Sequence, residues 1–253
     1  MIGGTGIKGP VNNATVAAHA INAGATGQRI GTTASNAGGN FNVSIGSCSG
    51  PVMLQMSGGT DTNEATGTMM SMAGADVMTA ALPNVAAGAV VTGVHMTPVT
   101  SMAQKIAQHL SGWMTEANVA AANAALGAYF MVSDILHVPP MNQLVAGTGS
   151  GATQDSINYG MTLAAVSRYA ASQAMNQSSA MVTALMNDAS DGVMDGMMGS
   201  MDNSKPMPST AGTGGLASAM SDFLGLNMNM SGATAAEMVA LMEQLRALNG
   251  MLQ

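Results

Sequence analysis

The sequence predicts an α+β protein in two parts, an N-terminal antiparallel β-sandwich over residues 1–96 and an α-helical domain over residues 97–253. Three observations predict this division. The first part contains short apolar runs that alternate with polar residues and are separated by Gly, Asn and Ser, as strands are. The second part repeats its apolar residues at helical spacing. Thr97-Pro98 stands where one pattern gives way to the other.

The clearest strands lie between residues 40 and 57. Two runs there have apolar side chains at alternate positions, which places each set on one face: Phe41, Val43 and Ile45, and then Val52, Leu54 and Met56. Further strands are predicted at Val11 and over residues 15–21, 28–34 and 90–96, with a tight turn at residues 36–39. This spacing of strands and turns is typical of a small sandwich.

The first helix is predicted from Ser101 and Gln104, which have the spacing of a capping box. Helices are also expected over residues 118–132, 155–175 and 178–188. The last helix has the clearest signals, because Thr234 and Glu237 form a second capping box and Asn249-Gly250 supplies a stop. Its apolar stripe consists of Met238, Leu241, Met242, Leu245 and Leu248.

The N-terminal part resembles the carboxypeptidase regulatory-like domain, a transthyretin-like β-sandwich. The residues that carry the resemblance are Gly9-Pro10-Val11, Ala14-Thr15-Val16, Gly31 to Ala34 and Gly39 to Val43. It implies a stalk or presenting module without catalytic residues. The whole chain resembles uncharacterised exported bacterial lipoproteins, through Thr97 to Ser101 and Asp188 to Gly196. That second resemblance implies export, with lipid anchoring of a precursor.

The charge content limits the partners. Charged residues make up 8% of the chain, far below the ~25% of ordinary soluble domains, and the net charge is −7. The six basic residues are scattered, so we expect neither nucleic acid nor an anionic membrane as a partner. No apolar run is long enough to span a membrane. Weak repulsion between copies favours a homo-oligomer or polymer.

No catalytic constellation is evident, and we expect a protein that is not an enzyme. Gly46 to Gly50 has the glycine spacing of a nucleophile elbow around Cys48, but it lies between two strands. Gly149-Ser150-Gly151 has no better context. Cys48 is the single cysteine and is expected to be a small buried apolar residue. The four histidines are far apart in the sequence, and each is expected to make an ordinary polar contact.

Two stretches are candidates for binding metal. Asp188, Asp191 and Asp195 lie where glycines bend the chain, and such oxygen ligands suit calcium. The alternative is an acidic loop whose aspartates cap backbone groups.

Methionine supplies 27 of the 253 residues, and thioethers suit Cu(I). The best copper candidates are Met194, Met197, Met198 and Met201. The alternative is that methionine fills the core in place of Leu or Ile.

The combined prediction is a non-enzymatic structural protein of a bacterial surface that self-associates into an extracellular assembly or filament. The segment from Ile7 to Val11 is a candidate strand for pairing with a neighbour, and the last helix is a candidate to dock on one. A copper-binding surface protein and a ligand- or carbohydrate-binding module are the alternatives. The expected location is extracellular or on the cell surface, with an export signal that this chain does not contain.

Overall fold

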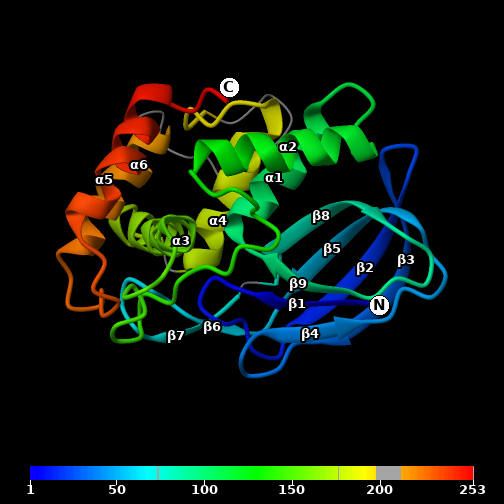
Figure 1. Cartoon of the computed structure of the whole chain (residues 1–253), viewed down its shortest axis with the longest axis horizontal. Helices are drawn as coiled ribbons and strands as arrows, with labels where there is room; N and C mark the ends of the chain where they lie inside the picture. The colour runs from blue at the N-terminus through cyan, green and yellow to red at the C-terminus, as the bar shows by residue number, and fades with distance from the viewer. Residues whose placement is uncertain (73, 176, 198–211, 253) are drawn as a thin grey trace.

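The computed structural model describes residues 1–72, 74–175, 177–197 and 212–252 (Figure 1). It is a mixed α+β structure in which the strands precede the helices along the chain. The described strands are β1 (Ile2–Gly6), β2 (Thr15–Asn22), β3 (Ala25–Ala34), β4 (Asn40–Val43), β5 (Gly50–Ser57), β6 (Thr60–Thr62), β7 (Met69–Ser71), β8 (Val77–Val85) and β9 (Val91–Met96). The described helices are α1 (Pro98–His109), α2 (Glu116–Tyr129), α3 (Gln154–Ser172), α4 (Ser178–Asp188), the short 3₁₀ helix η1 (Ala189–Asp191), α5 (Gly212–Leu224) and α6 (Ala235–Leu248).

The strands form two main sheets and a small hairpin. A four-stranded antiparallel sheet has the order β3-β2-β5-β8, and β6 pairs with β7. The three-stranded sheet has the order β4-β1-β9. Within it β1 is antiparallel to β4 but parallel to β9, so the prediction of a wholly antiparallel arrangement is wrong for this pair. The parallel pair joins strands that are distant in the sequence, which alternation alone does not reveal.

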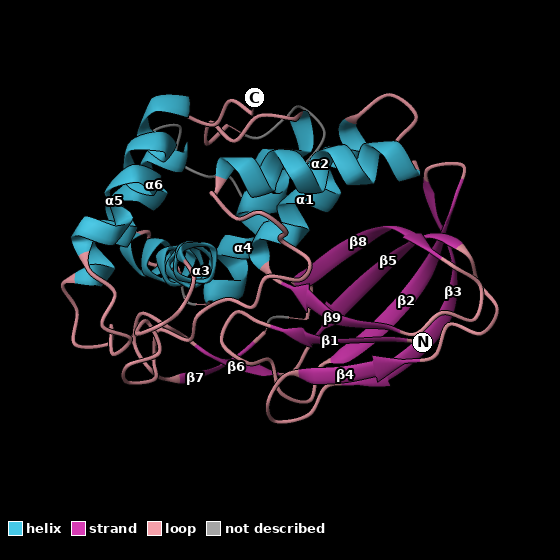
Figure 2. Ribbon diagram, viewed as in Figure 1, coloured by secondary structure: helices cyan, strands magenta, loops and turns pink. Residues whose placement is uncertain are grey.

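The four-stranded sheet contacts the three-stranded sheet on one face, and helices α1 and α2 contact it at β8. One face packs on the three-stranded sheet so closely that a Cβ added to Gly6 would lie 2.4 Å from Sδ of Met56. At β8, the last strand of this sheet, Thr100 of α1 donates a hydrogen bond to the carbonyl of Thr79 at 2.8 Å, and Asn123 of α2 donates to that of Ala81 at 3.1 Å. Figure 2 shows the helices gathered along the β8 side of the sheets.

The predicted alternation is present on the strands. All six apolar residues of the two alternating runs are buried: Phe41, Val43, Ile45, Val52, Leu54 and Met56. Met53, whose side chain lies on the opposite face of β5, is also buried, and its sulfur lies 3.7 Å from the hydroxyl of Thr26. A single buried apolar cluster contains residues of the strands, such as Val94 and Met96, together with residues of α1, such as Val99 and Met102.

The first helix begins earlier than the sequence predicts. Thr97 is its N-cap and forms a capping box with Thr100, so the capping box predicted at Ser101 and Gln104 is wrong. Those two side chains bind the sheet instead, since Ser101 Oγ accepts from the amide of Thr79 at 2.9 Å and Gln104 accepts from its hydroxyl at 3.1 Å.

The later helices follow the predicted pattern with small shifts. α4 covers residues 178–188 as expected, whereas α2 and α3 begin and end within three residues of their predicted bounds. The capping box of α6 at Thr234 and Glu237 is present, and Asn249 ends the helix in the left-handed region at φ 45°. The stripe predicted for α6 packs inside this chain against α5 and α3 rather than being left open for a neighbour. α5 was missed, because its glycine-rich start is typical of a loop.

The segment from Ile7 to Val11 is not the extended pairing strand that the sequence suggests. Ile7 and Pro10 form an isolated bridge across a tight turn, and Lys8, Gly9 and Val11 are buried. Gly9 has φ +60°, and an added Cβ would lie 2.3 Å from the carbonyl oxygen of Thr62. Only glycine fits this approach between the turn and β6. The turn therefore directs Lys8 inward.

Candidate functional site

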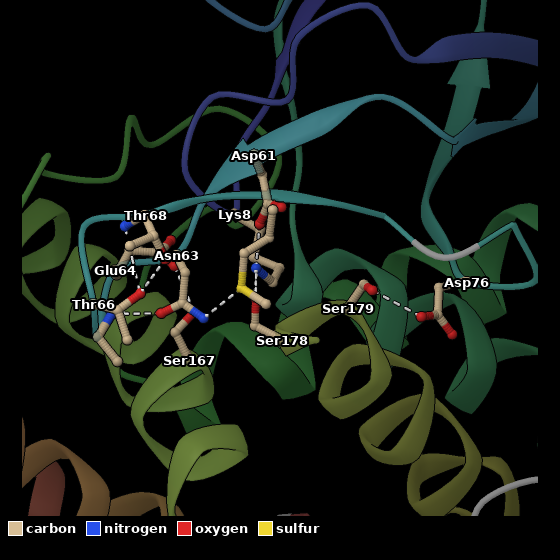
Figure 3. A network of polar contacts seen from close by, with 12 residues as sticks. Lys8, Asp61, Asn63, Glu64, Thr66, Thr68, Asp76, Ser167, Ser178 and Ser179 are labelled. Atoms are coloured by element: carbon tan, nitrogen blue, oxygen red, sulfur yellow. Dashed lines mark hydrogen bonds and ion pairs between the residues drawn. The ribbon is translucent and has the colours of Figure 1, made fainter. Parts of the chain in front are cut away.

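The most unusual side chain in the structure is Lys8, whose exposed fraction is 0%. Its ammonium group donates to Oδ2 of Asp61 on β6 and to Oγ of Ser178, the first residue of α4 (Figure 3). Asp61 is itself only 3% exposed. A fully buried lysine needs partners of this kind, because an unpaired charge in an apolar interior is very costly.

A second carboxyl group, that of Glu64, lies beside this ion pair and is 1% exposed. Its Oε2 accepts a hydrogen bond from Oγ of Ser167 on α3 at 2.5 Å. Its Oε1 has no hydrogen-bond partner among the described residues. Burial raises the pKa of Glu64 above its ordinary value, the charge of Lys8 opposes the rise, and Asp61 adds to it. We name Lys8, Asp61 and Glu64 the buried triad.

The loop between β6 and β7 holds Glu64 in place. Asn63 Oδ1 accepts from the amide of Ala65 at 2.9 Å, and its carbonyl accepts from the amide of Gly67 at 2.8 Å. These bonds close a tight turn that points the intervening side chain toward α3. The negative charge of Asp61 balances the positive charge of Lys8, and burial disfavours a second negative charge on Glu64.

The same region anchors the start of α4. Beside the Lys8 contact with Ser178, Ser179 Oγ donates to Asp76 Oδ2 at 2.8 Å (Figure 3). Thr183 Oγ1 donates to the other oxygen of Asp76 at 2.5 Å. The N-cap residue Gln177 makes no capping bond with its side chain, and the bonds to Lys8 and Asp76 hold the helix at that end.

A cavity of about 470 Å³ opens next to the triad and has Glu64 in its wall. Its lining mixes apolar side chains with amide, hydroxyl and carboxyl groups: Thr5, Ile7, Gly9, Pro10, Gly38, Thr62, Glu64 and residues 140–144. Sites for small molecules have volumes of roughly 300–1,000 Å³ and the same mixture of groups. Glu64 therefore forms part of the wall of a cavity whose size suits a small molecule.

The three aspartates predicted to bind calcium follow one another around a bent loop. Backbone amides donate to all three: Gly196 to Asp188 at 2.9 Å, Val193 to Asp191 at 3.0 Å and Met197 to Asp195 at 2.8 Å. Burial raises the pKa of Asp188 to about 7, and the nearby negative charges of Asp195 and Asp191 add to the rise. These contacts match the alternative interpretation, in which the aspartates of an acidic loop accept hydrogen bonds from backbone amides. The calcium site stays a prediction.

The methionines predicted to bind copper are not all described. Met194 is 0% exposed and Met197 is 53% exposed, whereas Met198 and Met201 lie outside the described residues. Many other methionines fill the core, for example Met56, Met96 and Met102. Within the described ranges, no group of three or more His, Cys, Asp or Glu side chains could hold a metal ion. The copper site stays a prediction.

Two histidines that are distant in the sequence are close in the structure. His95 on β9 has a pKa below its ordinary value, because burial disfavours its charge and His137 adds a positive charge nearby. His137 Nδ1 lies 2.8 Å from Oδ2 of Asp134, and both side chains are about half exposed. The sequence did not predict this proximity, because the pairing of the loop with β9 through the Leu136 carbonyl is long-range.

The glycine-flanked cysteine lies in the loop between β4 and β5, as the sequence predicts. Cys48 is half-buried and its thiol lies 3.8 Å from the carbonyl oxygen of Ser49. Gly149-Ser150-Gly151 lies in the turns before α3, and neither segment lies beside the buried triad.

Comparison of this chain with models of protein families, with curated proteins and with solved structures finds no match. Among the described helices, none is both long enough and apolar enough to cross a membrane.

Proposed function

We propose that this chain is a non-catalytic structural protein of a bacterial surface, exported from the cell, that associates with further copies of itself through strand β3. The proposal rests on strand β3, which has one edge without a partner strand among those described. It is a ten-residue strand at the end of the four-stranded sheet, and it pairs with β2 alone among the described strands. None of its residues is buried.

An edge strand of this length presents a row of backbone donors and acceptors that can pair with another chain. Natural proteins protect such edges with charged residues, proline or short length. β3 has a single charged residue, Arg29, and no proline. The low charge of the whole chain also leaves little repulsion between copies.

The single tryptophan lies next to this edge. Trp113 is 58% exposed, although tryptophan is usually well buried. The amide of Met114 donates to the carbonyl of Gly24 at 2.9 Å, which holds Trp113 beside the turn between β2 and β3. Exposed aromatic residues are enriched at protein interfaces. The two facing sheets accord with the carboxypeptidase regulatory-like sandwich, so we include that stalk-like module in the proposal.

The test measures the mass of the natively produced protein in solution across a range of concentrations, together with negative-stain microscopy. We expect oligomers or filaments that the double variant Gln28→Lys/Thr32→Lys disrupts, because both side chains are exposed on β3. Ala86→Lys/Ala87→Lys adds the same charge at exposed positions of the β8–β9 loop and serves as the matched control. A wild-type protein that stays monomeric at every concentration contradicts the proposal.

A second candidate function is the binding of a small ligand in the cavity beside Glu64. The free Oε1 of this residue favours it, since a buried acceptor without a partner suits a hydroxyl or amine donor. A titration with glucose and N-acetylglucosamine, followed by amide chemical shifts, tests this candidate. Binding shifts Gly38 and Asn142, which line the cavity, and leaves Gly88 unchanged. Shifts that are absent, or that are equal at all three positions, contradict it.

A further inference from the structure

We propose that Lys8 and Asp61 become joined covalently, through an amide bond between Nζ of Lys8 and Cγ of Asp61 that forms with loss of one water molecule, and that Glu64 transfers the protons. Nothing else in the chain is required for this condensation. The proposal goes beyond self-association and does not depend on it, because all three groups belong to the interior of one chain.

The first requirement is that the amine and the carboxyl group touch. The ammonium of Lys8 contacts Oδ2 of Asp61, so the carboxyl carbon is one bond from the contact. Well-oriented intramolecular partners reach effective molarities of roughly 10⁵–10⁸ M. The turn at Gly9 and the pairing of β6 with β7 hold the two side chains in this arrangement.

The second requirement is that water is excluded. In water an amine and a carboxylic acid stay apart as solvated ions, and the amide does not form. Here the exposed fractions are 0% for Lys8 and 3% for Asp61. Burial therefore removes the bulk water that would solvate the two ions separately and oppose loss of water.

The third requirement is a group that moves protons. Glu64 interacts electrostatically with both Lys8 and Asp61, and its Oε1 has no partner among the described residues. Ser167 holds the other oxygen, which orients the carboxyl group and leaves Oε1 for proton transfer. Ser178 accepts a hydrogen bond from Nζ, so it acts as a positioning residue for the nucleophile.

The condensation begins when a proton moves from the ammonium of Lys8 to the carboxylate of Asp61, which gives an amine and an acid. The nitrogen lone pair attacks Cγ and forms the C–N bond, while protonated Glu64 gives a proton to the carboxyl oxygen and takes one from the nitrogen. Glu64 then protonates the leaving hydroxyl, the C–O bond breaks, and the second hydroxyl returns a proton to Glu64. The products are an amide and water, which the adjacent cavity can receive.

The first experiment measures the intact mass of the folded and then denatured wild-type chain. We expect a mass that is one water lower than the sequence requires. Trypsin then locates the bond, because cleavage after Lys8 is blocked and residues 1–29 stay joined to residues 30–105. An unmodified mass, after native production and after prolonged incubation of the folded protein, overturns the proposal without any variant being needed.

Variants separate the roles of the three residues. Lys8→Arg keeps the charge but lacks the amine, and its mass should equal that of its sequence. Asp61→Asn should lose ammonia in place of water, which identifies Asp61 as the acyl partner. Glu64→Gln should leave the bond unformed or slow its formation at least tenfold while circular dichroism shows a folded chain. Formation at the wild-type rate in Glu64→Gln overturns the assigned role of Glu64.

The matched control is Lys105→Arg, which removes the lysine of α1 and should leave the loss of water unchanged. Aspartates followed by glycine, at Asp191 and Asp195, can also lose water by forming a succinimide. That loss would persist in Lys8→Arg and would not join the two tryptic peptides. Water loss with these properties therefore contradicts the amide bond.

Discussion

Glu64 and Asp188 are two buried carboxyl groups in different settings. Burial raises the pKa of both, yet Glu64 has the ammonium of Lys8 beside it, whereas Asp188 has the carboxylates of Asp195 and Asp191. The positive neighbour opposes the rise and the negative neighbours add to it. The sign of the neighbouring charge, as well as burial, therefore sets how far the pKa of an interior acid rises.

The largest expected effect comes from removing the cation of the triad. Lys8→Met leaves Asp61 buried without its partner, which should lower the free energy of unfolding by about 3–5 kcal/mol. Urea denaturation measures the change. Lys8→Met/Asp61→Leu is the control and should recover most of the loss, because a buried pair can be replaced by apolar residues of similar size. A single variant as stable as the wild type would show that the pair contributes nothing.

The second prediction concerns Asp188 and pH. Its pKa in the folded chain, about 7, exceeds the ordinary value of 3.8, so the folded state retains a proton that the unfolded state releases. Stability should therefore be greatest below pH 3.8 as far as this group is concerned, fall as pH rises toward 7, and change no further above it.

Asp188→Asn should remove this pH-dependent change in the free energy of unfolding, which amounts to at most about 4 kcal/mol. Asparagine resembles the protonated acid and can still accept a hydrogen bond from the amide of Gly196. Thermal denaturation of both proteins between pH 4 and 8 measures the difference. Parallel curves for the two proteins would mean that Asp188 is ionised in the folded chain.

A smaller effect is expected at the hydroxyl that holds Glu64. Ser167→Ala removes the hydrogen bond to Oε2 and should cost about 1–2 kcal/mol, since both groups are buried. The loss should also raise the pKa of Glu64 further, because this bond stabilises the ionised form. Ser172→Ala on the same helix removes only a bond to the carbonyl of Tyr169 and is the control. An equal loss in the free energy of unfolding for the two variants would show that the hydrogen bond from Ser167 contributes no more than an ordinary hydroxyl bond within the helix.

The smallest effect should follow from removing one like charge. Asp195→Asn retains an acceptor for the amide of Met197 but loses the charge that acts on Asp188. The pKa of Asp188 should move toward its ordinary value by a fraction of a unit. Titration of carboxyl carbons by NMR measures this shift, with Glu64 as the internal reference. A pKa that does not move would show that the charge of Asp195 does not contribute to the rise.

The predictability of the two sites differs for a physical reason. Asp188, Asp191 and Asp195 could be proposed as a site from the sequence because they are neighbours along the chain. Lys8 meets Asp61 and Ser178 only after the turn at Gly9, the β6–β7 hairpin and α4 have packed together. No local pattern encodes that meeting, and the only signal was a lone lysine in a chain with few charges.

The elements themselves were largely predictable where the periodicity is strong. The alternation at Phe41 and Val43 and the capping box at Thr234 correspond directly to β4 and α6. The start of α1 was misplaced because Ser101 and Gln104 imitate a capping box but bond to Thr79. Tertiary contacts outweighed local propensity there.

The place of β1 in its sheet affects how the chain emerges from the ribosome. β1 lies between β4 and β9, and Ile2 pairs with Val91. At about 5–20 residues per second, translation takes roughly 5–20 seconds to reach that partner after β1 has been made. During this interval Ile2, which is fully buried in the finished protein, has only part of its packing. The nascent chain should therefore be a substrate for chaperones until β9 has emerged.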